Sequence, residues 1–157
     1  MTAISANASF FVLAITSALL FYIALTDLRE FKIRNDLILV VAGLFFVHAL
    51  LSGRWVELHW NLGLAALAFA FMVYWYTQGL MGGGDLKLMT VALLWSGVKC
   101  ALPLLIIIVV AALIHALAAK RGYVAAQTVN GRMRIPFAPS IAAGLIGIFL
   151  LGCVSYH

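Results

Sequence analysis

The stretch Gly82-Gly83-Gly84-Asp85 joins three glycines to an aspartate at the start of an apolar segment. The 157-residue chain has only five Asp and Glu residues, and an ionised carboxylate at the edge of hydrocarbon is costly unless it is paired, solvated or protonated. Three glycines in a row carry no Cβ, so another backbone can approach them closely. We therefore interpret this stretch as the centre of a functional site that admits a peptide backbone.

The composition around this stretch is that of a membrane protein. Apolar residues make up 66% of the chain and charged residues 10%, against about 45–50% and about 25% in soluble domains. Backbone groups in hydrocarbon must be satisfied within helices. We expect an all-α, multi-pass integral membrane protein with one domain over residues 1–157. The net charge of +5 lies in short loops, so it indicates topology and no nucleic-acid partner.

Six apolar segments are candidates for spanning helices, each of which needs about 17–25 residues. They cover residues 9–26, 37–51, 58–77, 86–97, 100–119 and 136–154. The fourth is short, so it crosses only if Gly84 and Asp85 lie below the headgroups or the bilayer is locally thinner. Asn35 or Asp36 is a natural N-cap for the second span.

Basic residues in the loops set the expected orientation. Six spans place eight of the ten Lys and Arg residues on one side and only Arg54 and Lys99 on the other. Cytoplasmic loops carry the excess of Lys and Arg, so both termini are expected outside the cytoplasm. Asp27, at the end of the first span, and Asp85, at the start of the fourth, then reach the cytoplasmic face at similar depth.

Two carboxylates that share a site indicate acid–base chemistry. One stays ionised and takes a proton from water, while the other is protonated and polarises a carbonyl. This route needs no covalent intermediate, metal or other cofactor. A serine or cysteine nucleophile has less support, because no histidine is expected at that depth. Cys100 and Cys153 lie in apolar segments without a CxxC pair, and we interpret them as small buried apolar side chains.

Other interpretations of the two aspartates stay open at this point. Asp27 could cap a loop or pair with a nearby basic residue, and Asp85 could be the N-cap of the fourth span. Asp36 favours a cap, and Lys87 is expected to extend back to the cytoplasmic surface. An ion- or proton-coupled transporter could use Asp27 and Asp85 as a relay, and an inactive scaffold of a pilus or secretion assembly could retain both.

Three segments resemble motifs of the type IV prepilin peptidases, aspartic proteases of the membrane. Residues 82–88, Gly-Gly-Gly-Asp-Leu-Lys-Leu, resemble the GxGD-x-K-L segment of that family. Residues 27–35, which begin with Asp27 and end with Asn35, resemble its first-aspartate segment, D-x(5)-IPN. Residues 135–144 are similar to its PFGP…G segment. The matches occur in the family order.

The resemblance implies a GxGD-class endopeptidase with Asp27 and Asp85 as the catalytic pair. It would cleave the leader of prepilin-like proteins at the cytoplasmic face of the bacterial inner membrane. Such substrates combine a basic leader with a hydrophobic helix, and the lipid bilayer and a pilus or secretion assembly are the other implied partners. The residues expected to support the loops or the substrate are Gly82, Gly83, Gly84, Lys87, Asn35 and Pro136.

The length and two departures from the motifs refine this expectation. The short chain resembles the compact branch that serves tight-adherence (Flp) pili. It has no paired CxxC motifs, so we expect a peptidase without methyltransferase activity. Arg34 stands where the family usually has proline, and Ala138 where it often has glycine. These changes concern loop shape and substrate preference more than the chemistry.

Overall fold

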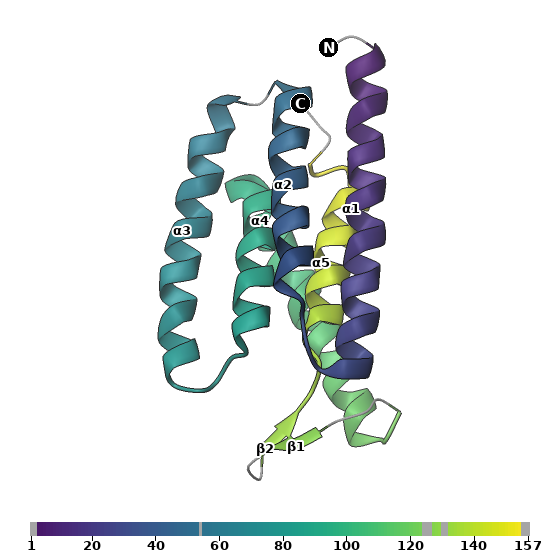
Figure 1. Cartoon of the computed structure of the whole chain (residues 1–157), viewed down its shortest axis with the longest axis vertical. Coiled ribbons are helices and arrows are strands. Elements are labelled where there is room, and N and C mark those ends of the chain that lie inside the picture. The colour runs from purple at the N-terminus through teal and green to yellow at the C-terminus, as the bar shows by residue number, and fades with distance from the viewer. Residues whose placement is uncertain (1–2, 54, 124–126, 130–131, 155–157) are drawn as a thin grey trace.

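The computed structural model describes residues 3–53, 55–123, 127–129 and 132–154, which form a bundle of helices with a small hairpin at one end (Figure 1). In these ranges the elements are α1 (Ala3–Glu30), α2 (Asn35–Ser52), α3 (Trp55–Thr77), α4 (Gly83–Lys120), β1 (Gln127–Val129), β2 (Arg132–Arg134) and α5 (Ala138–Leu150).

The helices confirm the expected class of a helical, multi-pass membrane protein. Four of them, α1 to α4, are long and apolar enough to cross a membrane, and α5 is a shorter apolar helix. The six expected spans therefore correspond to five helices in the described ranges, because α4 includes both the fourth and the fifth.

Helix α4 is interrupted at Gly97, whose φ of 60° and ψ of −175° are not helical. A Cβ built at Gly83, where α4 begins, would lie 3.4 Å from Tyr76 near the end of α3. A Cβ built at Gly97 would instead meet the side chain of Asn61, near the start of α3. The first arm of α4, residues 83–96, therefore runs antiparallel to α3.

The second arm of α4, residues 98–120, returns alongside α5. His115 and Ser140 are hydrogen-bonded at 2.9 Å, near the end of the arm and the start of α5. At the other end of the two segments, Cys100 forms a disulfide with Cys153. The two arms of α4 thus run in opposite directions, and Gly97 marks the reversal.

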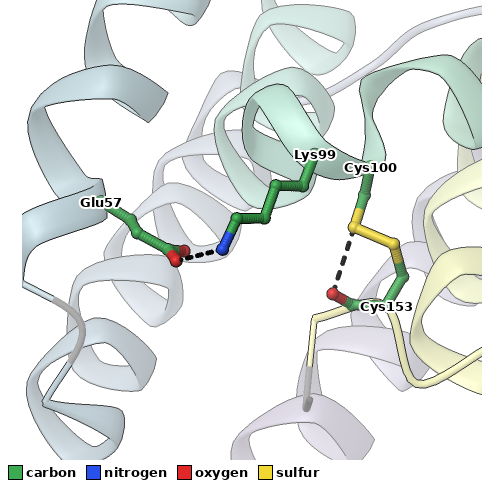
Figure 2. A network of polar contacts seen from close by, with 4 residues as sticks. All are labelled: Glu57, Lys99, Cys100 and Cys153. Carbon is green, nitrogen blue, oxygen red and sulfur yellow. Dashed lines mark hydrogen bonds and ion pairs between the residues drawn. A yellow bond between two sulfur atoms is a disulfide. The ribbon is translucent and has the colours of Figure 1, made fainter. Parts of the chain in front are cut away.

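The disulfide corrects the interpretation of both cysteines as free apolar side chains (Figure 2). The partners are 53 residues apart, and only the reversal at Gly97 brings Cys100 to the end of α5. Nearby, Lys99 Nζ lies 2.6 Å from Glu57 Oε1 on α3. This end of the bundle is thus connected by a covalent bond and by an ion pair.

The core is centred on the first arm of α4 and on α5. Trp95 is 2% exposed, and its indole N–H donates a hydrogen bond to the Val41 carbonyl at 3.0 Å. Its ring meets Phe45 and Phe149 with centroid distances of 5.7 and 5.1 Å. One side chain therefore joins α2, α4 and α5, and its polar atom has the partner that burial requires.

The connection between α1 and α2 is shorter than expected. The polar loop predicted for residues 27–36 is reduced to residues 31–34, because α1 continues through Asp27 to Glu30. Helix α2 begins at Asn35 with Arg34 at the N-cap position and no side-chain cap. The prediction that Asn35 or Asp36 caps this helix is therefore wrong.

A β-hairpin occupies part of the polar segment between α4 and α5, where no strand was expected. Strands β1 and β2 are antiparallel, with Val129 opposite Arg132, so Asn130 and Gly131 connect them. An Asn-Gly pair between two strands is a strong short-range sequence signal for such a hairpin. From the sequence we expected this segment only as a polar connection and did not consider the Asn-Gly pair.

The reversal at Gly97 yields a stability prediction. An alanine at this position would occupy a backbone region that is essentially restricted to glycine, at a cost of about 1–3 kcal/mol, and its Cβ would collide with Asn61. We expect Gly97→Ala to lower the thermal unfolding temperature of the detergent-purified protein. Gly43→Ala is the matched control, because a Cβ at Gly43 in α2 meets no atom within 4 Å. Equal melting of the two variants would contradict this role of Gly97.

Candidate active site

The Asp27 carboxylate is held by the start of α5. It lies one turn before the end of α1 and is 5% exposed. Its Oδ2 accepts a hydrogen bond from the backbone N–H of Ala138 at 3.0 Å. The sequence predicted Pro136 as a supporting residue of the site, but it did not predict this contact, since 111 residues separate Asp27 from Ala138.

This contact makes Asp27 a cap supplied by another helix. The first N–H groups of a helix have no partner within it, and Phe137, at the N-cap position of α5, provides no side-chain hydrogen bond. A negative charge at a helix N-terminus is stabilised by about 0.3–1 kcal/mol, and by up to about 2 kcal/mol when partly buried. The start of α5 therefore both orients the Asp27 carboxylate and stabilises negative charge on it.

One open alternative was an ion pair between Asp27 and a nearby basic residue. The structure does not show Arg34 in that role. Arg34 forms an ion pair with Asp36, its Nη2 lying 2.6 Å from Oδ2. The hydrogen bond to Asp36, and then the charge of that carboxylate, raise the pKa of Arg34 above its ordinary value. Arg34, at the end of the connection between α1 and α2, and Asp36, in the first turn of α2, thus satisfy each other at an exposed position.

Asp85 lies in the first turn of α4 and is half-buried. Gly82 takes the N-cap position, and its carbonyl accepts the Leu86 N–H at 3.0 Å. A Cβ built at Gly82 would lie only 2.8 Å from Asp85 Oδ2. The absence of a side chain at Gly82 therefore leaves the space that the Asp85 carboxylate occupies.

The two following glycines serve internal packing. A Cβ at Gly83 would be in ordinary contact with Tyr76 of α3, whereas one at Gly84 would lie 2.9 Å from Ile33 Cβ. Gly84 thus allows the connection between α1 and α2 to rest against the start of α4. The sequence predicted close approach at these glycines, and the approaching groups in the structure belong to the chain itself.

Lys87 and Asn35, both predicted to support the site, bind each other. Lys87 Nζ donates to Asn35 Oδ1 at 3.0 Å, and both residues are exposed. This bond joins the start of α4 to the start of α2, while Ile33 rests on Gly84. The two aspartate-bearing segments therefore meet at one end of the bundle, as expected from the sequence.

Pro136 is buried in the three-residue segment between β2 and α5. It precedes the helix, although the sequence predicted it within the first turn, and Pro139 is the proline inside that turn. A proline fixes φ near −65° and has no N–H to satisfy. Pro136 therefore stiffens the approach to the N–H groups that bind Asp27.

His115 and Ser140 were not predicted as site residues. Ser140 is in the first turn of α5, close to Ala138, and its hydroxyl bonds His115 Nδ1. We expected no histidine at the depth of the two aspartates, but His115 lies beside the helix start that binds Asp27. That expectation is therefore wrong. Ser140 is nevertheless fully buried, which leaves a substrate carbonyl no access to its hydroxyl. The contact joins two segments that are distant in sequence, and no local motif signals it.

A cavity of about 280 Å³ lies at the other end of the bundle, between α2, α3 and the Gly97 reversal. His48, Asn61 and Trp95 contribute to its lining, and Glu57 is the one carboxylate among the described residues that line it. Within the described ranges, no group of three or more His, Cys, Asp and Glu side chains is placed to hold a metal ion. The two predicted aspartates therefore belong to a different part of the molecule.

Comparisons with known proteins bear on the segments that carry Asp27 and Asp85. The model of a family described as the type IV leader peptidase family matches residues 14–117, which include Asp27 and Asp85. A prepilin leader peptidase/N-methyltransferase from Bacillus subtilis (strain 168) is 34% identical over 145 residues. That alignment covers 86% of this chain and 53% of the relative, so the chain spans about half of the relative's length. No solved structure matches the chain.

The capping contact predicts how substitutions at Asp27 affect stability. Asp27→Ala leaves the buried Ala138 N–H without its acceptor, which costs about 1–3 kcal/mol. Asp27→Asn keeps an acceptor oxygen, so we expect it to unfold at a temperature closer to that of the unsubstituted protein. Thermal unfolding in detergent measures both. An Asp27→Ala protein that is as stable as Asp27→Asn would show that the Ala138 contact does not stabilise the fold.

Proposed function

The chain belongs to the type IV leader peptidase family, and from this premise we propose that it is a membrane aspartic endopeptidase that removes leader peptides from prepilin-like proteins. Asp27 and Asp85 form the proposed catalytic pair. The observation that carries the proposal is the position of Asp27, whose carboxylate is oriented by α5 at the end of the bundle where α4 presents Asp85. Membership of the family does not by itself assign the catalytic pair, and neither does the position of one aspartate.

The different surroundings of the two aspartates support different roles. The Asp27 carboxylate accepts the Ala138 N–H at the start of α5, and because a hydrogen bond to a carboxylate favours its charged form, we assign Asp27 the ionised state. Asp85 is half-buried beside Gly82, and we assign it the shared proton. Two carboxylates in one site cannot both ionise cheaply. Their titration belongs to the pair as a whole.

Hydrolysis then follows the general acid–base route. Asp27 accepts a proton from water, whose oxygen bonds to the carbon of the scissile peptide carbonyl. Asp85 donates its proton to the carbonyl oxygen, so that a neutral gem-diol forms. Asp27 next delivers its proton to the peptide nitrogen, and the C–N bond breaks. A hydroxyl proton of the gem-diol returns to Asp85 as the carboxyl product forms, which restores both residues.

We place this site at the cytoplasmic face of the bacterial inner membrane, in a single domain that crosses six times with both termini outside. The two antiparallel arms of α4 provide the fourth and fifth crossings. With six spans, eight of the ten Lys and Arg residues lie on the side that carries Asp27 and Asp85, and an excess of basic residues in the loops indicates the cytoplasmic side. The disulfide adds support of a different kind, because disulfides persist in oxidising compartments and Cys100–Cys153 lies at the end away from Asp27.

The proposed substrate is a prepilin-like protein with a basic leader and a hydrophobic helix, of the tight-adherence (Flp) type, delivered within the bilayer. An assembly machinery for pili or secretion would receive the product. A membrane-embedded substrate fits a site at the end of a bundle whose lateral surface is apolar. Leu39, Leu67 and Leu102, for example, are each about 70% exposed.

The catalytic pair predicts the activity of asparagine variants. Asp27→Asn and Asp85→Asn keep side-chain size but remove the shared-proton arrangement. We expect each to abolish leader cleavage of a coexpressed prepilin-like protein, measured by a mobility shift, and the double variant to be no worse, since groups that act together are non-additive.

Asp36→Asn is the matched control for these variants. Asp36 is in the first turn of α2, at the same end of the bundle, but pairs with Arg34, so the variant should cleave normally. All three proteins should reach ordinary membrane levels. Cleavage by either dyad variant would show that the pair is not catalytic.

The orientation predicts which residues are accessible from each side of the membrane. After reduction, the half-buried Cys153 should react with a membrane-impermeant maleimide added outside intact cells stripped of their outer membrane. A cysteine introduced at Thr128, in a variant with both native cysteines replaced by serine, should react only after the inner membrane is opened. The reverse pattern would place Asp27 and Asp85 on the outer side.

A further inference from the structure

We propose that the β1–β2 hairpin is the docking edge for the substrate, which adds an extended segment to β2 through backbone hydrogen bonds. The partner is thus an unfolded stretch of polypeptide around the cleaved bond. This inference rests on the proposed peptidase function, and it assigns a role to an element that the catalytic pair does not use.

The hairpin leads directly into the candidate active site. Strand β2 ends at Arg134, and only three residues separate it from Ala138, whose N–H binds Asp27. Four residue steps span at most about 14 Å when fully extended. The bond between His115 and Ser140 holds the first turn of α5 against α4. The short segment that joins β2 to α5 is therefore held in place where it enters α5.

Among the residues that the structure describes, each strand of the hairpin has an edge that pairs with no other strand. The sheet consists of β1 and β2 alone within the described ranges. The outer edge of a strand presents N–H and C=O groups that can pair with an added chain. Peptide-binding domains use this mode of recognition, in which the main chain provides the affinity.

A substrate of this enzyme needs such a partner. Within a helix, a peptide carbonyl is engaged in the helical hydrogen bonds, so the segment to be cleaved has to be extended. Near hydrocarbon, the N–H and C=O groups that are freed in this way are costly unless they find partners. Pairing with β2 would satisfy them beside Asp27.

The register identifies the backbone groups that are available. Val129 and Arg132 flank the two-residue connection and form a hydrogen-bonded pair in such a hairpin. Hydrogen-bonded and non-bonded pairs alternate along antiparallel strands, so the next pair, Thr128 and Met133, directs its N–H and C=O groups outward. Met133 is on β2, the strand that continues toward α5, and Thr128 is on the opposite edge.

Two proline substitutions at the same level of the hairpin test this assignment. Proline removes an N–H and is tolerated at strand edges, so Met133→Pro removes the proposed donor to the substrate and Thr128→Pro removes its counterpart on β1. We expect Met133→Pro to raise KM for a purified prepilin-like substrate by about 3- to 10-fold, the effect of one hydrogen bond. Thr128→Pro should stay close to the unsubstituted enzyme, and equal values for the two variants, high or low, would overturn the assignment.

A binding measurement separates this proposal from the catalytic one. A synthetic peptide that contains the leader and the first part of the hydrophobic helix carries ¹³C carbonyls around the cleaved bond. When it is bound to Asp27→Asn protein, its labelled infrared band should move to the position of paired β-strands. The shift should be lost with Met133→Pro and kept with Thr128→Pro in the same background. A labelled band that stays helical would overturn edge pairing, whereas failure of catalysis alone would leave this result intact.

Discussion

The contact between the Asp27 carboxylate and the Ala138 N–H connects the chemistry of this protein to its fold. It joins α1 to the start of α5 at 3.0 Å, in a place where α5 has no cap of its own. The same bond satisfies a helix end and orients a carboxylate, so stability and the proposed catalysis draw on one interaction. Removing the Asp27 acceptor, as in Asp27→Ala, would therefore affect both.

The rest of the molecule keeps α5 in the position that this contact needs. His115 binds Ser140 in the first turn of α5, and the disulfide between Cys100 and Cys153 holds the segment that follows its last turn. Both partners come from the second arm of α4, which faces α5 only because the chain reverses at Gly97. A glycine far from the aspartates thus determines which residues can support them.

Two short helical segments, α5 and the first arm of α4, lie at the centre of the bundle. Helix α5 has 13 residues, which is about 20 Å of helix, against a hydrocarbon core of about 30 Å. It is also largely buried, as is the first arm of α4. Because these two segments carry Ala138 and Asp85 at their starts, their shortness is compatible with a site below the level of the headgroups. A peptide bond near the membrane surface could then reach both carboxylates.

The sequence by itself determined the membrane class and the positions of most helices, because long apolar runs and charged loops are local properties. It also predicted that Asp27 and Asp85 lie at the same end of the bundle, because the order of the spans decides the end at which each helix starts. The glycine run likewise predicted close approach at the start of α4. Only the tertiary structure showed the capping of α5 by Asp27, the disulfide, and the contact between His115 and Ser140. Each depends on the chain reversal at Gly97 or on the packing of α1 against α5. Such pairings join residues far apart in the chain, and the pattern of neighbouring residues does not specify them.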